Sequence, residues 1–464
     1  MRLVCVSNRV APPRRGAAPG GLAVGVLAAL RRTGGLWFGW SGNAAGEGER
    51  APEIVARDGI RYATIDLCAE DIERYYNGYC NASLWPLFHY FPGRFAYDEE
   101  NFQAYQRVNA RFATELLKLL RPGDLVWVHD YHLMPLARIL RDRGFSGPIG
   151  FFLHIPFPHA QVLRVLPNHE TLMRDLCCYD LVGLQTRDDV QSFVSAVRLA
   201  FGGAVRCDDG RLDVGGRRVS VGTYPIGVDV DAIRQEAART VQEETVQRLI
   251  ASLLGRRLII GVDRLDYSKG LIQRFAAYEH FLEHDPESHG RVTLLQIAPL
   301  SRTDVLAYTE IRRALEQATG KLNGRLAAAD WTPVRYLNRN YSHATLMGFL
   351  RAAHVALITP VRDGMNLVAK EYVAAQDPDD PGVLVLSSLA GAAHELTGAL
   401  LANPYDRRGI AEALRAALHM PLAERRERHR EMAEVLRRND IHRWSERFCH
   451  DLQAAGAYGP PAAA

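Results

Sequence analysis

Two cations in the second half of the sequence suit the binding of a diphosphate. Arg264 and Lys269 share one loop, which follows the apolar run Leu258–Val262. Such a run predicts a buried strand, so both side chains would reach the carboxyl end of a sheet, where ligands bind. There they could hold a diphosphate and stabilise its charge as it leaves. Taken alone, the motif fits an ordinary surface ion pair with Asp266 equally well.

A second segment combines the features of a phosphate site and a sugar site. Residues 359–371 read TPVRDGMNLVAKE, an expected strand end followed by an expected helix. Gly364 permits a tight turn, and the backbone amides of the new helix could bind phosphate oxygens. Asp363 could hold sugar hydroxyls, and the Glu371 carboxylate could accept from both hydroxyls of a ribose. The structural alternative is that Asp363 caps the helix and Glu371 lies on its solvated face.

The N-terminal region offers a possible anion site. The first apolar run ends in Ser7-Asn8-Arg9, and Gly20-Gly21 stand where a helix is expected to begin. Free amides and the helix dipole favour an anion at such a point. The alternative is a flexible surface loop whose glycines serve only the turn. Neither GxGxxG nor GxxxxGK[ST] occurs, which weakens the dinucleotide-binding and P-loop interpretations.

Several histidines raise the question of a metal. They occur in the segment 129–132 and at His154 and His159, and Asp130 and His154 both follow expected strands. Histidines near strand ends commonly bond backbone groups and one another. The helical HExxH pattern and paired cysteines are missing, and the HELTG sequence at His394 lacks the second histidine. The sequence therefore predicts no metal site.

Aromatic residues gather in the first hundred residues. Tyr75, Tyr76 and Trp85 follow Trp37 and Trp40. Aromatic faces with polar edges suit a sugar ring. A cluster of core aromatics is the more common explanation for such a group, and the pattern alone does not choose between them.

These residues need a scaffold that brings strand ends together. Continuous apolar runs alternate with amphipathic stretches, which is typical of parallel sheets covered on both faces, the α/β class. Expected strands are Leu3–Ser7, Leu125–His129, Ile149–His154, Leu181–Gln185, Leu258–Val262, Val292–Ile297, Val355–Thr359 and Val383–Ser387. Expected helices are Gly21–Arg32, Tyr105–Leu120, Leu271–Glu283, Asp304–Ala318, Asn366–Ala375, Leu422–Arg438 and Asp440–Leu452, and a helix-rich connector spans Val230–Leu254. A change of region near Pro225-Ile226-Gly227 predicts domains at 1–226 and 227–440, with 441–464 as a helix and a disordered tail that packs back toward the first domain.

Composition narrows the class of protein. The chain has 464 residues, 47% hydrophobic and 23% charged, with a net charge of +3. This near-balance argues against a nucleic-acid binder that works through a bulk basic surface. No run is long enough to span a membrane, and Asn8-Arg9 interrupt any signal peptide. The 7 cysteines have no repeated spacing, so we expect reduced thiols in a cytoplasmic protein.

Long phrases of the sequence resemble the trehalose-6-phosphate synthase family of retaining GT-B glycosyltransferases. They are VSNR at 6–9, GGLAVG at 20–25, GLWFGWSG at 35–42, LWPLFHY at 84–90, WVHDYHL at 127–133, GFFLHIPFP at 150–158, RLDYSKG at 264–270 and RDGMNLVAKEYVAAQ at 362–376. The resemblance runs from about residue 2 to 453, in the family's order. No phosphatase region follows, so the stand-alone form is expected.

The resemblance implies a fold and a reaction. The fold is GT-B, two Rossmann-like domains that face an interdomain cleft: residues 1–226 bind the acceptor and 227–440 bind the nucleotide sugar. Glucose would pass from a nucleotide-glucose, most often UDP-glucose but also GDP- or ADP-glucose, to glucose 6-phosphate with retention. The family's proposed mechanism is a front-face displacement without a covalent intermediate, a cofactor or a metal. The resemblance also implies a homo-oligomer, a dimer or tetramer, with no nucleic-acid or membrane partner.

The resemblance assigns roles to individual residues. Catalytic roles fall on Asp130, His154, Arg264, Lys269 and Asp363. The acceptor contacts are Arg9, Tyr76, Trp85, Asp130, Ile155 and Arg302, among which Arg9 and Arg302 clamp the phosphate. The donor contacts are Gly20, Gly21, His154, Arg264, Lys269, Tyr341, Asp363, Gly364, Met365, Asn366, Leu367 and Glu371. Glu371 would bind the ribose hydroxyls, and His154 would bond the glucose 6-hydroxyl. Tyr341 would lie near the base.

Two alternatives share this fold. Glucosylglycerol-phosphate synthases and pseudoglycosyltransferases have a similar donor site with a different acceptor, and the presence of Arg9, Tyr76, Trp85 and Arg302 favours glucose 6-phosphate. A silent sugar-phosphate sensor would be expected to lack Arg264, Lys269, Asp363 or Glu371, and all four are present.

Overall fold

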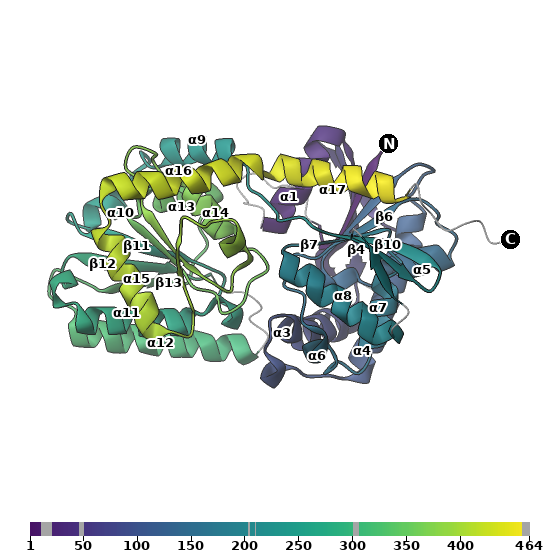
Figure 1. Ribbon diagram of the computed structural model, residues 1–464, viewed down its shortest axis with the longest axis horizontal. Helices are drawn as coiled ribbons and strands as arrows, with labels where there is room; N and C mark the ends of the chain where they lie inside the picture. The colour runs from purple at the N-terminus through teal and green to yellow at the C-terminus, as the bar shows by residue number, and fades with distance from the viewer. Residues whose placement is uncertain (11–20, 46–50, 203–204, 209, 300–305, 457–464) are drawn as a thin grey trace. The chain divides into compact units, whose positions relative to one another are not determined.

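The structure is a computed structural model that describes residues 1–10, 21–45, 51–202, 205–208, 210–299 and 306–456 (Figure 1). Its contacts group into two compact units. The first contains Met1–Ile226 together with the segment from Ile441, and the second contains Gly227–Asp440. Each unit is built around one sheet.

The first unit contains a ten-stranded sheet in the order β3-β4-β2-β1-β5-β6-β7-β10-β9-β8. The strands from β4 to β10 in that order are parallel, and the pairs β3–β4, β10–β9 and β9–β8 are antiparallel. The bounds are β1 Leu3–Arg9, β2 Gly35–Ala44, β3 Glu53–Arg57, β4 Ile60–Leu67, β5 Leu125–His129, β6 Ile149–Phe152, β7 Leu181–Leu184, β8 Arg206–Asp208, β9 Arg211–Val214 and β10 Arg217–Thr223.

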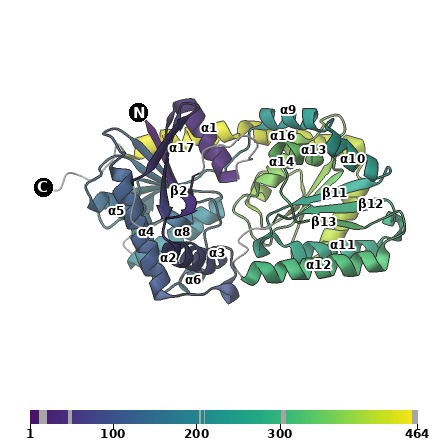
Figure 2. The same cartoon turned by 180° about the vertical axis from the view of Figure 1, so that it is seen from behind.

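Helices cover both faces of this sheet. One face carries α1 (Gly21–Thr33) and α17 (Ile441–Gly456), which contact each other, and the other carries the row α4 (Glu99–Leu117), α5 (Leu136–Asp142), α7 (His169–Leu176) and α8 (Arg187–Phe201) (Figures 1 and 2). The unit also contains the π-helix η1 (Ile72–Leu84) and the short helices α2 (Ala69–Asp71), α3 (Trp85–Phe88) and α6 (Ala160–Leu163).

The second unit contains a six-stranded, wholly parallel sheet in the order β13-β12-β11-β14-β15-β16. In chain order this is 3-2-1-4-5-6, the order of doubly wound nucleotide-binding sheets. The bounds are β11 Arg257–Val262, β12 Val292–Ile297, β13 Val334–Leu337, β14 Val355–Ile358, β15 Val383–Ser387 and β16 Leu400–Ala402.

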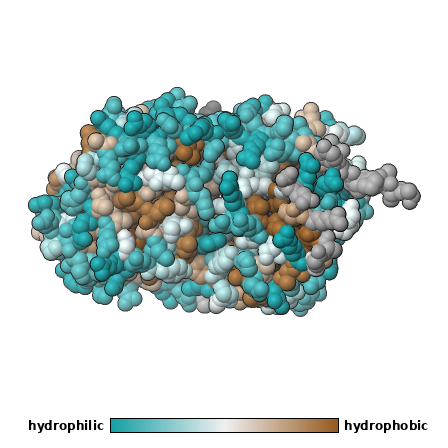
Figure 3. Space-filling model, in the orientation of Figure 1, coloured by the Kyte–Doolittle hydropathy of each residue, from teal (hydrophilic) through white to brown (hydrophobic). Residues whose placement is uncertain are grey.

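Two helical layers enclose the second sheet. The core on one face packs α11 (Leu271–His284), α12 (Leu306–Leu326) and α15 (Arg407–His419) against the strands. The other face carries α9 (Val230–Thr240), α10 (Glu244–Ser252), α13 (His343–Ala352), α14 (Leu367–Ala375) and α16 (Leu422–Arg438) (Figures 1 and 2). As its sequence predicts, α16 presents a hydrophilic surface (Figure 3).

The predicted strands are confirmed, each within about two residues of its expected bounds. Burial explains this success, because β5, β12 and β15 are buried at every position and so read as continuous apolar runs. Helix α4 begins earlier than predicted, at Glu99, since the Asp98 carboxylate accepts from the Asn101 amide and caps the helix there. The described helices include none long and apolar enough to cross a membrane, and the cysteines are free thiols.

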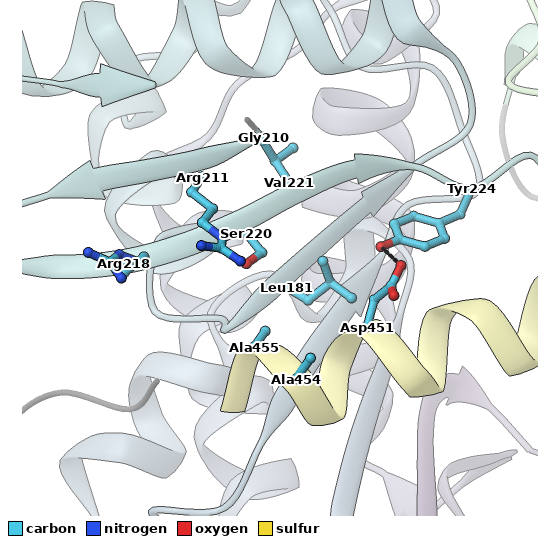
Figure 4. Close-up of a pocket in the computed structure, with 10 residues that line it drawn as sticks. All are labelled: Leu181, Gly210, Arg211, Arg218, Ser220, Val221, Tyr224, Asp451, Ala454 and Ala455. Atoms are coloured by element: carbon cyan, nitrogen blue, oxygen red, sulfur yellow. Dashed lines mark hydrogen bonds between the residues drawn. The ribbon is translucent and has the colours of Figure 1, made fainter. Parts of the chain in front are cut away.

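Helix α17 is bound to the sheet of the first unit by its aromatic side chains. Phe448 stacks on Trp127 of β5 with ring centroids 4.4 Å apart and planes at 11°. About one turn further along the helix, Tyr224 donates a 2.8 Å hydrogen bond to Asp451, in a crevice between β10 and α17 (Figure 4). Although α17 is distant in sequence, it is therefore an integral layer of the first unit.

Gly183 makes room for this helix. A Cβ atom at Gly183 would lie 2.6 Å from Phe448 and 2.9 Å from Phe152. We expect Gly183→Ala to destabilise the protein by about 1–3 kcal/mol through overpacking. Gly320→Ala in α12, where an added Cβ meets nothing within 4 Å, is the control and should stabilise by up to about 1 kcal/mol. Urea unfolding of both variants checks the opposite signs; a neutral Gly183→Ala would contradict the packing described here.

Candidate functional site

The parallel part of each sheet contains a switch point, where the chain continues first to one side of a strand and later to the other, and four of the predicted site residues end or follow the strands there. In the first sheet β1 lies between β2 and β5, and Arg9 and Asp130 end or follow β1 and β5. In the second sheet β11 lies between β12 and β14, and Lys269 and Asp363 follow β11 and β14. Such switch points open a crevice at the carboxyl ends of the strands, where ligands bind in open α/β sheets.

Arg9 is an exposed cation supported by an aromatic ring and a glycine. Its guanidinium carbon lies 5.2 Å from the ring centroid of Trp40. Gly42 has a φ of +92°, and a Cβ atom there would come within 2.1 Å of an Arg9 terminal nitrogen. An alanine at position 42 would therefore displace the exposed Arg9 guanidinium from this place, and the planar fork of that group is suited to a phosphate.

An aromatic wall stands close to Arg9. Tyr76, on η1, meets Trp40 edge-to-face at 5.6 Å and stacks on His132 at 5.9 Å. Trp85 is only 4% exposed and packs on His89 and Tyr131. Trp85 therefore belongs to a buried aromatic cluster, as the core interpretation predicts, and Tyr76 lies half-buried at its edge; a contact with a sugar ring stays a prediction.

Asp130 adopts a backbone conformation that is rare for a residue with a side chain. Its φ is +76° and its ψ 164°, a strained combination that surrounding structure must enforce and that is frequent at functional sites. Its carboxylate accepts from the His154 amide at 3.3 Å, which joins the ends of β5 and β6. Ile155, next in the chain, is buried.

His154 is a neutral imidazole. Burial lowers its pKa to about 3, and burial together with His154 holds the pKa of His129 well below its usual value. His129 Nδ1 lies 3.1 Å from His154 Nε2, so one proton is shared between two neutral rings. If His129 donates it, His154 carries its own proton on Nδ1 and can donate to a sugar hydroxyl.

In the second unit, Lys269 is paired with Asp363. Lys269 Nζ donates to Asp363 Oδ2 at 2.6 Å, and both side chains are 13% exposed. Lys269 therefore pairs with Asp363, while the Asp266 carboxylate is buried and accepts from the Ser268 amide. Arg264 is exposed on the same loop.

A completely buried arginine lies beneath these loops. Arg274 of α11 pairs with Asp263 at 2.5 Å and donates to Gln296 at 2.8 Å and to Thr359 at 3.1 Å. It also reaches the carbonyl of Lys269 at 3.4 Å. One guanidinium thus joins the ends of β11, β12 and β14 to the loop that carries Lys269.

Helix α14 begins at the predicted phosphate segment, but its cap differs from the one considered above. The Asn366 side chain accepts from the Ala369 amide at 3.1 Å and is the N-cap, while its amide nitrogen donates to Asp363 at 3.0 Å. Gly364, Met365 and Asn366 are buried and Leu367 is partly buried. Asp363 therefore does not cap the helix and faces Lys269 instead.

Glu371 is not on a solvated face. It is 19% exposed, with Oε1 3.6 Å from His343. Tyr341, two residues before His343, packs edge-to-face on Phe349 at 5.2 Å, and Arg339 lies over its ring. The predicted ribose and base residues of the donor site thus have a common neighbourhood at the start of α13.

Two predicted residues, Gly20 and Arg302, lie outside the described part of the chain, and Gly21 is the first residue of α1.

Within the described part of the chain, one group of three side chains could hold a metal: His280, Glu283 and His284 on α11, none of them predicted. Sequence reasoning also missed Arg274, His343 and Glu236, since no pattern along the chain marks side chains that meet between distant segments.

Comparison with known proteins gives the family. Residues 14–454 match glycosyltransferase family 20. The chain belongs to this family. Its relatives within family 20 include the trehalose-6-phosphate synthase of Klebsiella pneumoniae subsp. pneumoniae, 50% identical over 97% of this chain and 95% of the relative, and that of Salmonella arizonae, 49% identical over the same shares. The predicted resemblance is confirmed.

Solved structures agree with the family assignment. A UDP-forming alpha,alpha-trehalose-phosphate synthase of Burkholderia xenovorans in complex with glucose-6-phosphate is 49% identical, with a TM-score of 0.95 over 98% of this chain and 100% of that one. The E. coli protein bound with UDP-2-fluoro glucose is 47% identical, with a TM-score of 0.94 over 98% and 99%. These similarities confirm the predicted α/β GT-B class for this member of glycosyltransferase family 20.

Proposed function

We propose that the chain transfers glucose from UDP-glucose to glucose 6-phosphate, giving trehalose 6-phosphate and UDP. The observation that carries this proposal is the pair of half-sites at the two switch points: an exposed arginine beside aromatic rings in the first unit, and the Lys269–Asp363 pair with Glu371 in the second. Similar synthases have been solved with glucose-6-phosphate and with UDP-2-fluoro glucose.

In the first unit the acceptor meets Arg9 through its phosphate. Tyr76 adds a hydroxyl, Trp85 and Ile155 shape the pocket, and Asp130 accepts from acceptor hydroxyls. The aromatic faces suit the apolar face of a sugar ring. Arg302 is the second phosphate ligand in this proposal.

In the second unit the donor diphosphate meets Lys269 and Arg264, and the Asp363–Leu367 segment holds the glucose and phosphates. As the glycosidic bond breaks, negative charge develops on the departing phosphate, where these two cations stabilise it. That phosphate takes the proton from the attacking acceptor hydroxyl, so the new bond forms on the face from which UDP leaves and the α configuration is retained. The step requires neither a covalent enzyme intermediate nor a metal.

Product analysis tests this proposal. Purified protein is incubated with glucose 6-phosphate and UDP-, GDP- or ADP-glucose, with and without EDTA. We expect trehalose 6-phosphate, with UDP-glucose the preferred donor and EDTA without effect. Nucleotide-sugar binding without trehalose 6-phosphate would favour another acceptor, as in glucosylglycerol-phosphate synthases, and would overturn the acceptor assignment.

A glycine substitution tests the role of Arg9. Gly42→Ala would displace the guanidinium, so we expect KM for glucose 6-phosphate to rise by about tenfold to a hundredfold, the worth of one or two charged hydrogen bonds. The affinity for UDP should stay unchanged. Gly59→Ala is a matched control, because Gly59 also has a positive φ, of 76°, but has nothing within 4 Å of an added Cβ. Equal effects of both substitutions on KM would refute the role of Arg9.

A further inference from the structure

His343 stands between two carboxylates in the second unit. Its Nδ1 lies 3.0 Å from Glu236 Oε2 on α9, and its Nε2 lies 3.6 Å from Glu371 Oε1 on α14. Helix α9 contacts both α13 and α14, and the three helices lie side by side in both ribbon views (Figures 1 and 2). The contact with Glu236 is a hydrogen bond, and the contact with Glu371 is an ion pair at slightly longer range.

The local sequence fixes the histidine in this place. His343 is the first residue of α13, whose N-cap Ser342 accepts from the Thr345 amide at 3.1 Å. The contacts with Glu371 and Glu236 raise the pKa of His343 to about 9, against the opposing effect of burial. His343 is therefore a cation at neutral pH, and a protonated imidazole donates from both nitrogens at once.

We propose that Glu236 and His343 are positioning residues, which hold the Glu371 carboxylate in the orientation that receives the ribose hydroxyls of the nucleotide. This inference rests on the proposed function, in which Glu371 binds ribose. The histidine engages Oε1, and a carboxylate has a second oxygen with its own acceptor positions. A helix that precedes the second sheet, α9, would thus take part in nucleotide recognition without contact to the nucleotide.

The expected effect follows from side-chain order. A glutamate released from its partner regains rotamer freedom, which must be lost again when the nucleotide binds. We expect His343→Ala to weaken UDP binding by about tenfold to thirtyfold. Glu236→Gln should act in the same direction with a smaller effect, because His343 remains.

The test measures the binding of UDP and of 2′-deoxy-UDP by calorimetry, without turnover. The unmodified protein should prefer UDP. Glu371→Gln and His343→Ala should lose most of this preference, because the lost contact is the one to the ribose hydroxyl. His284→Ala, an exposed histidine on α11, is the matched control and should keep it. His343→Gln retains the size of the side chain without its charge and serves if the alanine variant does not fold.

Two outcomes would overturn the inference. Variants at His343 that keep the full preference for UDP, or that lose equal affinity for both nucleotides, would show that His343 does not act through the ribose contact. A different result would refute the proposed function instead. If the unmodified protein binds neither nucleotide, or binds both equally, it does not recognise the ribose hydroxyl.

The pH profile gives a second readout. Protonated below pH about 9, His343 bridges the two carboxylates, so the preference for UDP should be constant to about pH 8 and fall as the pH rises through 9. Glu371 and Glu236 are the charged groups that raise this pKa, and Arg239 lies 4.0 Å from Glu236. Glu236→Gln removes one carboxylate and should move the fall to lower pH. The titration of the uracil ring affects the unmodified protein and the Glu236→Gln variant alike. If the preference for UDP falls at the same pH in both, the bridge is contradicted.

Discussion

Lys269→Ala is expected to lower kcat by about 10²–10³-fold, with a smaller change in the affinity for UDP-glucose. The departing diphosphate becomes more negative in the transition state than in the bound substrate. A preorganised cation at that point stabilises the transition state by about 3–4 kcal/mol. In the structure Lys269 is held ready by Asp363 at 2.6 Å. Steady-state kinetics with both substrates varied, together with UDP binding by calorimetry, separates turnover from binding.

The sequence offers matched controls for this experiment. Lys321 is an exposed lysine on α12 of the same unit, and Lys321→Ala should leave kcat unchanged. Lys269→Arg keeps the charge but changes its geometry, so it should retain part of the turnover. A Lys269→Ala variant with normal kcat at saturation would rule out its role at the leaving group, while leaving the acceptor half of the proposal intact.

Arg274→Met is expected to destabilise the second unit by about 3–5 kcal/mol, because it leaves Asp263 buried without its cation. Arg274 is 0% exposed and also donates to Gln296 and Thr359. Its bond to the Lys269 carbonyl adds a functional effect, since the loop that carries Lys269 loses an anchor. The KM for UDP-glucose should therefore rise in any Arg274 variant that folds.

Tryptophan positions allow this loss to be measured unit by unit. Trp331 belongs to the second unit, and Trp37, Trp40, Trp85, Trp127 and Trp444 belong to the first. In 5-fluorotryptophan-labelled protein, the 19F signal of Trp331 should report unfolding at lower urea in Arg274→Met. Arg239→Ala, which removes an exposed pair between α9 and the N-cap of α10, should leave the Trp331 midpoint nearly unchanged. An unmoved Trp331 transition in Arg274→Met would contradict the expected role of the buried pair.

The sequence predicted the scaffold of the site well, for a physical reason. Strands buried on both faces, such as β5 and β12, must be apolar throughout, so they can be recognised without an alignment. Residues at the carboxyl ends of such strands lie along one edge of their own sheet. For this reason Arg9 and Asp130 could be singled out in the first sheet, and Lys269 and Asp363 in the second. The sequence did not predict strand β2, because this strand ends in Ser41-Gly42-Asn43, a polar stretch typical of turns.

Other features depend on contacts between distant segments. The aspartate at 363 could have capped α14, but Asn366 does so and Asp363 pairs with Lys269. The meeting of Glu236, His343 and Glu371 requires three helices to pack in one arrangement, and no spacing along the chain encodes it. The left-handed backbone of Asp130 is likewise imposed by its surroundings rather than by its residue type.

Helix α17 has a consequence for synthesis on the ribosome. The first unit needs residues 441–456, which are translated after the whole second unit. At about 5–20 residues per second, residues 227–440 take roughly 10 to 40 s to make. During that interval the groove over β5, β6 and β7 that receives Phe448 has no occupant. The first unit to be translated is therefore the last to be completed, and until α17 is made its sheet exposes apolar surface of the kind that favours aggregation.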